Sequence, residues 1–407
     1  MVARKQEFET PYAWARLTAS LALMTLGGVG MYAAAVALPA IQADFGITRS
    51  EASLPYALTM VGFGFGGILM GRLADRFGVM VPVMIGTIAM GVGFVAAGLA
   101  PNLASFAIAQ CLLIGALGNS ATFAPLVADA SHWFNRRRGI AVAICASGNY
   151  VAGAVWPPVL QHFFDADGWR QTFIGVGIFS IVAMLPLALA LRRRPPDHAA
   201  PESSVHGARP SAQPLGFTPG ALQAILCVAG LACCVAMSMP QVHIVAYCGD
   251  LGFGLARGAE MLSLMLGCGI ASRLASGWIC DHIGGLRTLL LGSLLQGVAL
   301  ALFLFFDSLV SLYVIAALFG LFQGGIVPSY AIIVREYFTP REAGARVGLV
   351  LMATLFGMAL GGWMSGAVFD LTGSYRAAFV NGIAWNLLNV AIAVGLYYRS
   401  RRRHAFA

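Results

Sequence analysis

The sequence predicts an all-α membrane protein with twelve transmembrane helices in two pseudo-symmetric six-helix halves and with both termini in the cytoplasm. Hydrophobic residues make up 59% of the chain, charged residues only 10%, and the mean hydropathy is +0.79. A soluble fold of this length is far less apolar. Apolar runs of about 20 or more residues recur along the chain, and each is long enough to cross a hydrocarbon core of ~30 Å as a helix.

These runs predict spans at residues 15–38, 51–71, 79–99, 103–128, 139–160, 170–191, 217–247, 259–280, 287–306, 309–333, 345–369 and 376–398. With the N-terminus in the cytoplasm, 20 of the 25 Lys and Arg residues fall in cytoplasmic segments and 4 in outer loops, which leaves Arg273 inside a span. Cytoplasmic loops of membrane proteins are enriched in these residues, so both termini are predicted to be cytoplasmic. The net charge of +8 then reflects topology, and no nucleic-acid partner is expected.

Other composition features narrow the class. All eight Cys residues lie inside or at the edges of spans, so no structural disulfide is expected. The first span lacks a small-residue cleavage site and is predicted to be a retained helix. Arg far outnumbers Lys, which occurs only as Lys5, and this bias favours a bacterial inner membrane. The sequence contains no motif typical of a nucleotide-binding loop, zinc protease or serine hydrolase, so we expect neither an enzyme nor a bound metal or cofactor.

The chain also repeats itself. The matching pairs, each 206 residues apart, are Gly71 and Gly277, Asp75 and Asp281, Arg170 and Arg376, and Phe173 and Phe379. Between the repeats, residues 192–216 are rich in Pro, Ser and Ala and predict a flexible cytoplasmic linker. The predicted units are an N-terminal half over residues 1–191, this linker, and a C-terminal half over residues 217–407.

The segment GRLADRFG after span two and its echo GWICDHIGG after span eight resemble the major facilitator superfamily. Within it, residues 132–153, 239–253, 272–284 and 319–338 resemble the bacterial branch of the monocarboxylate transporter family, with the oxalate/formate antiporter-like proteins as near kin. The resemblance implies a secondary transporter with a central site between two halves that rock in alternating access.

GRLADRFG predicts a tight cytoplasmic turn bearing Asp75 and Arg76. The resemblance implies that these residues and Asp281 form gates that latch the two halves through charge contacts and a helix N-terminus. The alternative is a polar loop of ordinary topology. Asp281 favours the gate, because topology alone requires no acid there. Pro240 in span seven favours a bend that could act as a gating hinge.

Arg273 is a lone charge deep in span eight, eight residues before Asp281 and so about 12 Å from the cytoplasmic end at ~1.5 Å per residue. Such a charge costs at least ~2.5 kcal/mol, so it usually faces a cavity and serves function. The guanidinium fork suits one carboxylate. The resemblance implies that this arginine binds the substrate carboxylate, although Gly269 stands where animal members carry an aspartate. The alternative is a structural ion pair or a bond to helix carbonyls.

His243 is the leading candidate for proton coupling. All seventeen Asp and Glu residues fall at span ends or in loops, whereas histidine takes up a proton near its unperturbed pKa of ~6.5. A packed histidine bonded to backbone is the alternative. The weaker candidates, all at span ends, are Asp44, Glu51, Asp129 and Glu260.

The resemblance also implies that spans one, four, seven and ten line the cavity. Beside Arg273, the candidate substrate contacts are Tyr32, Asn119, Phe123, His243, Gln323, Ser329 and Tyr330, joined by Asn149 of span five. Each alone is more often helix glue or an interfacial aromatic, so we expect about half of them to touch substrate.

These features predict a monomeric secondary transporter of a small organic monocarboxylate, moved together with a proton across the lipid bilayer. One buried cation favours a monoanion over a dianion. Export of an anionic or amphipathic drug or metabolite is the alternative, because aromatic residues and methionines would suit its apolar body. A non-transporting sensor of the same fold is the less favoured reading.

Overall fold

A computed structural model of the chain describes residues 9–134, 137–193 and 214–405. The helices are α1 (Pro11–Gly27), α2 (Val29–Phe45), α3 (Arg49–Phe77), α4 (Met80–Gly98), α5 (Leu103–Ile108), the π-helical η1 (Ala109–Asn119), α6 (Ala124–Trp133), α7 (Arg138–Asp167), α8 (Trp169–Leu189), the short η2 (Pro214–Gly216), α9 (Pro219–Asp250), α10 (Leu255–Ile283), α11 (Gly285–Phe305), α12 (Leu309–Gln323), α13 (Ile326–Tyr337), α14 (Pro340–Thr372) and α15 (Tyr375–Ala405). Within the described residues, twelve helical stretches are long and apolar enough to cross a membrane, which confirms the predicted number of spans.

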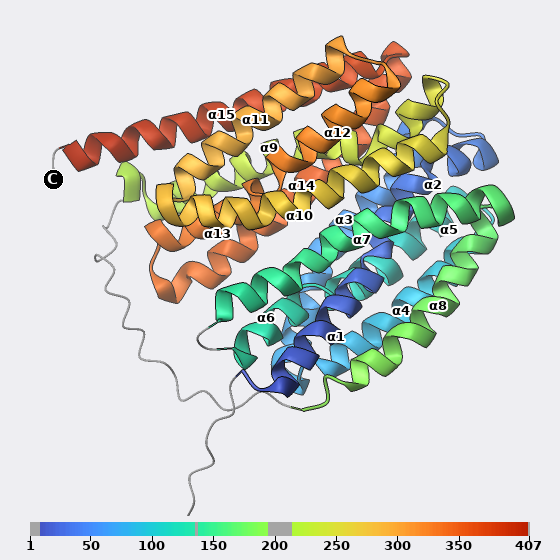
Figure 1. The fold of residues 1–407 in the computed structure, drawn as a ribbon, viewed down its shortest axis with the longest axis horizontal. Helices are drawn as coiled ribbons and strands as arrows, with labels where there is room; N and C mark the ends of the chain where they lie inside the picture. Colours follow the sequence, from blue (N-terminus) through green and yellow to red (C-terminus); the bar gives the residue numbers. More distant parts are fainter. Residues whose placement is uncertain (1–8, 135–136, 194–213, 406–407) are drawn as a thin grey trace, which may run out of the picture.

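The helices form two bundles, α1–α8 and α9–α15, that lie side by side (Figure 1). They meet chiefly where α3 packs on α14 and where α7 packs on α10. We call the end of the molecule where α1 begins and α15 ends the terminal end, and the opposite end the far end. Most of the predicted linker, residues 194–213, lies outside the described residues.

Three spans are built from shorter helices. Span one breaks at Gly28, between α1 and α2, span four breaks between η1 and α6, and span ten breaks between α12 and α13. A Cβ atom at Gly28 would lie 2.4 Å from that of Ala152 on α7, so this break also allows a close helix approach. α9, in contrast, continues through Pro240. The bend predicted at Pro240 therefore does not interrupt the helix in this conformation. The break in span one instead lies at Gly28, where two helices approach closely.

The predicted turn at GRLADRFG needs correction. α3 continues to Phe77, so Asp75 and Arg76 lie in its last turn, and the chain reverses only at Gly78, where φ is +87°. α10 likewise continues past Asp281 and ends before Gly284, where φ is +83°. Glycine adopts this left-handed backbone without strain. The apolar run in the sequence marks only the part of each helix that is long enough to cross a membrane. Polar residues that follow the run extend the same helix beyond the predicted span.

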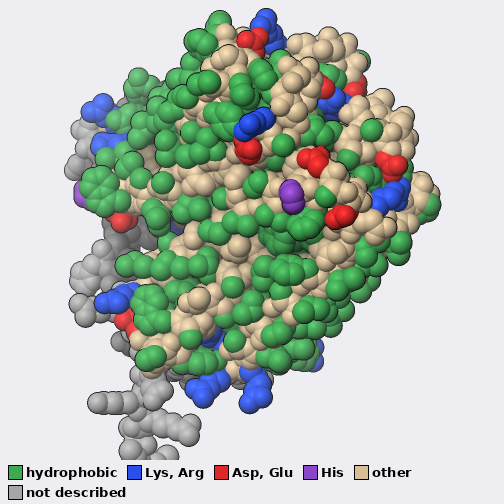
Figure 2. All heavy atoms as spheres, turned by 45° about the vertical axis from the view of Figure 1, so that its right-hand side comes forward, with side chains coloured by type: hydrophobic (Ala, Val, Ile, Leu, Met, Phe, Trp, Pro, Cys, Tyr) green, Lys and Arg blue, Asp and Glu red, His purple; other side chains and the backbone are tan. Residues whose placement is uncertain are grey.

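The outer surface is typical of a bundle that faces lipid. Hydrophobic side chains are spread over the whole face drawn in Figure 2, whereas charged side chains are few and lie along its edges and on its right-hand half. Large apolar residues on helices of both bundles are half-exposed or more, including Phe65, Val182, Trp278 and Val310. A soluble protein of this size does not leave so many apolar side chains uncovered, whereas a bilayer buries them.

Candidate functional site

The two bundles are tied together at the far end around Arg49, the first residue of α3. Its guanidinium makes two bonds to Asp250 of α9, at 3.1 and 3.3 Å, and one of 2.6 Å to the Tyr375 hydroxyl. The Asp370 carboxylate at the end of α14 accepts the backbone N–H groups of Arg49 and Ser50 at 2.9 and 2.8 Å. A carboxylate stabilises a helix N-terminus through its unpaired N–H groups and its dipole. We call these five residues the far-end closure.

His243 lies directly under this closure and contacts one of its residues, Tyr375. It is fully buried, with Nε2 at 2.8 Å from the Gly362 carbonyl and Nδ1 at 3.2 Å from the Tyr375 hydroxyl. A carbonyl only accepts, so Nε2 carries the proton. Because Arg49 donates to the Tyr375 oxygen, that hydroxyl can donate to Nδ1. The neutral imidazole therefore connects α9 and α14 to the arginine that joins the bundles.

α14 and α3 pack tightly up to this closure. A Cβ atom at Gly366 would lie 2.9 Å from the Arg49 carbonyl oxygen, and one at Gly362 would lie 3.1 Å from the Tyr56 ring. Small residues let helix backbones approach in this way. Farther along α3, Gly67 and Gly71 have nothing within 4 Å of the Cβ position, and Ile68 and Leu69 are each 50% exposed. The bundles therefore part toward the terminal end.

The predicted gate residues lie in the open part. Asp75, Arg76 and Asp281 are all exposed, and none of them forms an ion pair with another residue that the structure describes. The structure therefore brings together the residues of the far-end closure and leaves these three apart.

Arg273 lies at the boundary between the closed and the open part. Its Nη1 donates to the Ala146 carbonyl of α7 at 3.1 Å, and its Cζ lies 4.6 Å from the centroid of the Tyr150 ring. Its Nε is buried without a hydrogen-bond partner. Among the described residues it forms no ion pair. Leu274, the next residue, and Trp278, five residues farther along α10, are 55% and 66% exposed.

Two candidate contacts, Tyr32 and Asn149, lie along the face of α7 that includes Ala146. Asn149 and Gly153 follow Ala146 at helical spacings of three and seven residues, and Tyr150 is the residue after Asn149. The Tyr32 hydroxyl of α2 donates to the Asn149 carbonyl at 3.2 Å, and a Cβ atom at Gly153 would lie 2.7 Å from the Tyr32 ring. Tyr32 and Asn149 thus belong to the neighbourhood of Arg273.

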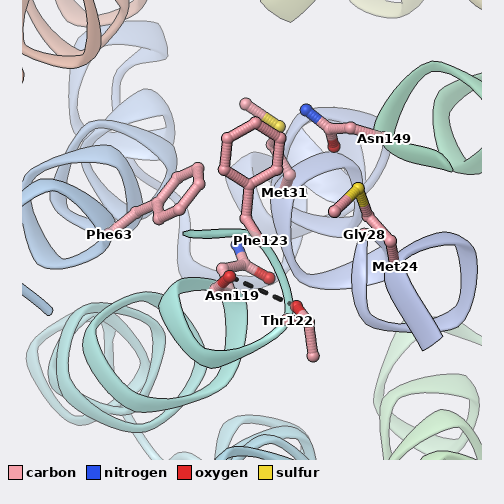
Figure 3. Close-up of a pocket in the computed structure, with 8 residues that line it drawn as sticks. All are labelled: Met24, Gly28, Met31, Phe63, Asn119, Thr122, Phe123 and Asn149. Atoms are coloured by element: carbon pink, nitrogen blue, oxygen red, sulfur yellow. Dashed lines mark hydrogen bonds between the residues drawn. The ribbon is translucent and has the colours of Figure 1, made fainter. Parts of the chain in front are cut away.

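A small pocket opens beside Asn149 within the first bundle (Figure 3). Its lining residues are Met24, Gly28, Met31, Phe63, Asn119, Thr122, Phe123 and Asn149. Asn119 is only 3% exposed, and neither its Oδ1 nor its Nδ2 has a hydrogen-bond partner. An unpaired buried amide is costly, so this side chain is available for a polar group that enters the pocket.

The span-ten candidates have partners inside the second bundle. The Tyr330 hydroxyl donates to Asn389 of α15 at 2.8 Å, and the Ser329 hydroxyl donates to the Gly325 carbonyl at 2.7 Å. Gln323 accepts a bond of 2.9 Å from Gln241, while its Nε2 is buried without a partner. In this conformation Tyr330 and Ser329 stabilise helix packing, and Gln323 alone keeps a free donor.

Two other arginines are more deeply buried than Arg273, contrary to the expectation that Arg273 is the single deep charge. Arg16 of α1 is 2% exposed and pairs with Asp129 of α6 through bonds of 2.7 and 2.9 Å. Arg49 is 8% exposed. Both lie at the edges of predicted spans, where sequence reasoning assigned them to loops. For Arg16, an acid at the end of span four on the same predicted side was the available signal.

The other acids at span ends also have partners. Asp44 pairs with Arg170 at 2.8 Å, Glu51 caps α3 through Thr48, and Glu260 pairs with Arg257 at 2.9 Å and accepts from the Tyr313 hydroxyl. In the part of the chain that the structure describes, no three His, Cys, Asp or Glu side chains are grouped as metal ligands.

Two helical bundles that are tied at one end, parted at the other and hold a half-buried arginine where they part define a membrane transporter. The chain belongs to the Major Facilitator Superfamily, whose sequence pattern matches residues 19–311 and 261–406. This confirms the predicted superfamily and fold, and the protein is a transporter rather than an enzyme.

Individual relatives agree. The chain is 30% identical to monocarboxylate transporter 13 of Rattus norvegicus over 342 residues, 82% of this chain and 76% of that one. It is 26% identical to human monocarboxylate transporter 11 over 407 residues, 95% and 83% of the two chains. Among solved structures, a bacterial homolog of the human lysosomal transporter Spinster, inward-facing and occupied, superposes with a TM-score of 0.75 at 17% identity and covers 97% of this chain and 98% of that one.

Proposed function

We propose that this transporter moves a small organic monocarboxylate by alternating access and that Arg273 pairs with the substrate carboxylate. The supporting observation is the guanidinium itself, which is held by a carbonyl and an aromatic ring, keeps an unpartnered Nε, and has no ion-pair partner among the described residues. A bidentate carboxylate would satisfy two of its remaining donors and neutralise its charge. The animal relatives, monocarboxylate transporters 13 and 11, are named for this substrate class.

The two ends of the molecule supply the gates in this proposal. With the termini in the cytoplasm of a bacterial cell, the far-end closure is the outer gate, and the described conformation is inward-open. Asp75, Arg76 and Asp281 meet partners only when the terminal end closes, and Pro240 lets α9 bend in that step. Reversing the charge of Asp75 to Lys should reduce uptake several-fold; unchanged uptake would exclude the gate.

The proton moves on His243 or on the substrate. In the closed far end both ring nitrogens of His243 are engaged, and Tyr375 connects the ring to the Arg49 charge. A second proton on the ring would place two cations around one hydroxyl, so His243 takes up a proton only after the closure has opened. Proton uptake at this position would then accompany the outward-open state.

Uptake into proteoliposomes tests the substrate class. Purified, monomeric protein is reconstituted, and entry of labelled short monocarboxylates is measured with an inward proton gradient. Unlabelled monocarboxylates should compete, whereas their methyl esters and the matching dicarboxylates should not, because esters lack the charge and a second carboxylate lacks a second cation. Equal competition by the esters would contradict pairing with Arg273.

Export of an amphipathic anion is the second candidate. It is favoured by the four apolar side chains of the pocket, Met24, Met31, Phe63 and Phe123, which could hold a larger apolar body next to Asn119. Cells that express the transporter would then tolerate an amphipathic organic acid better than cells without it. An importer of the same acid makes them more sensitive.

A further inference from the structure

Tyr150 fills a notch that Gly269 leaves in α10. A Cβ atom at Gly269 would lie 2.4 Å from Tyr150 Cε1 and 2.6 Å from Cδ1. Contacts this short do not occur, so any other residue at 269 would have to displace the ring. The notch is specific, because Gly267 on the same helix has only one atom, the Ala154 Cβ, within reach, at 3.8 Å.

The same ring lies under the guanidinium of Arg273. Gly269 and Arg273 are four residues apart and therefore occupy neighbouring positions on one helix face. The Tyr150 ring centroid lies 4.6 Å from Arg273 Cζ, and the Ala146 carbonyl, one turn earlier on α7, accepts from Nη1 at 3.1 Å. The arginine of one bundle is thus held by a ring and a carbonyl of the other.

This support differs from an acid partner in one respect. A ring face attracts a cation through its quadrupole, but it carries no charge and accepts no strong hydrogen bond. The Arg273 charge therefore remains unneutralised, and its Nε has no partner. A carboxylate at position 269 would instead consume the charge that an anionic substrate needs.

The ring also closes one side of the guanidinium. A carboxylate that binds the fork edge-on lies in the guanidinium plane. Substituents on the carbon next to that carboxylate project above and below the plane, and Tyr150 occupies one of these two sides. Bulk at this carbon is therefore accepted on one side only.

We propose that Tyr150, seated in the Gly269 notch, is a positioning and specificity-determining residue that holds Arg273 ready for a single carboxylate and selects acids that are unbranched next to it. The specificity part rests on the proposed pairing of Arg273 with substrate. The notch itself does not depend on that pairing, and so the two can fail separately.

A double-mutant cycle in the full-length protein tests the notch. We expect Gly269→Ala to lower the thermal midpoint by a few degrees, because it overpacks the ring, and to do so far less in a Tyr150→Ala background. Gly267→Ala, where the Cβ has room, is the matched control and should change little. Equal effects of Gly269→Ala in both backgrounds would overturn the notch.

Binding of butyrate and of its branched isomer 2-methylpropanoate tests specificity, measured as ligand-induced thermal shift and as competition for uptake. We expect Tyr150→Ala to weaken butyrate binding about tenfold and to narrow the preference for butyrate over the isomer, and Tyr150→Phe, which keeps the ring, to resemble wild type. Tyr150→Phe behaving like Tyr150→Ala would overturn the role of the ring face. If Tyr150→Ala binds both acids as the wild type does, the specificity proposal is overturned while the proposed function stands. If the wild type responds to no monocarboxylate, both the proposed function and the specificity are overturned, and only the notch remains.

Discussion

Arg16 and Arg273 are both arginines inside membrane-spanning helices, yet their surroundings are opposite. Arg16 is 2% exposed and makes two short bonds to Asp129, with the Trp133 ring 4.8 Å from its Cζ. Arg273 has a ring and a carbonyl but no ion-pair partner among the described residues. The first charge is neutralised within one bundle, whereas the second is not neutralised by any residue that the structure describes.

The difference shows how a buried cation is assigned a role. A cation with a bidentate carboxylate partner is a closed unit, and removing one member leaves an unpaired charge. A cation that is held but not neutralised keeps its charge for an anionic ligand, which is the role that we propose for Arg273. Position within a membrane-spanning helix does not by itself distinguish the two, because α1 and α10 each contain one of them.

Removing the Arg273 charge should have the largest effect on transport. We expect Arg273→Ala to lose about 2 to 5 kcal/mol of substrate binding, which is a loss of about thirtyfold or more in affinity. Arg273→Lys keeps the charge without the planar fork and should fall in between. Initial uptake rates in proteoliposomes measure both, and wild-type uptake by Arg273→Ala would contradict the comparison.

Removing Asp129 should instead reduce stability. Asp129→Ala leaves the Arg16 charge buried and unpaired, which costs about 3 to 5 kcal/mol. The thermal midpoint in detergent should fall clearly, whereas that of Arg273→Ala should change little. The double variant Arg16→Met with Asp129→Leu replaces the whole pair by apolar side chains and should recover most of the loss. If the thermal midpoint of the double variant stays as low as that of Asp129→Ala, the ion pair stabilises the fold by more than mutual neutralisation of its two charges.

Arg49 gives an intermediate case, because its acid partner lies on the other bundle. Arg49→Ala should weaken the far-end closure by about 1 kcal/mol, enough for about a fivefold shift toward the open far end. A cysteine placed at the fully buried Ser53, which faces α14, should then react faster with a membrane-impermeant reagent. Arg170→Ala breaks the pair with Asp44 inside the first bundle and is the matched control, with no change expected.

His243 is the proposed carrier of the proton that accompanies the anion. Uptake by wild type should rise as the external pH falls through about 6.5, the ordinary pKa of histidine, because the protonated ring belongs to the outward-open state. His243→Gln should show a flatter pH profile, while exchange of substrate at equal pH persists. An unchanged profile would assign the proton to the substrate.

The fold was predictable because the membrane imposes simple rules on sequence. Spans must be about 20 apolar residues long. The recurrence of Asp75 as Asp281, 206 residues later, showed which spans of the second half correspond to those of the first. Helix ends were less predictable, since α3 continues through Arg72 and Asp75 until Gly78 stops it. Polar residues end the hydrophobic signal without ending the helix.

For the site, the sequence by itself determined that Arg273 lies far from both ends of its span, is permanently charged, and has no acid within two turns of it along its own helix. Only the tertiary structure decided that Tyr150 and Ala146 hold it, that His243 lies under the far-end closure, and that Arg16 is satisfied by Asp129. The physical reason is that burial and charge belong to single residues and their segments, whereas neutralisation depends on which helices become neighbours. Which helices become neighbours depends on close packing at glycines such as Gly269 and Gly366. These glycines have no side chain, and a ring or backbone of the neighbouring helix occupies the space that one would fill.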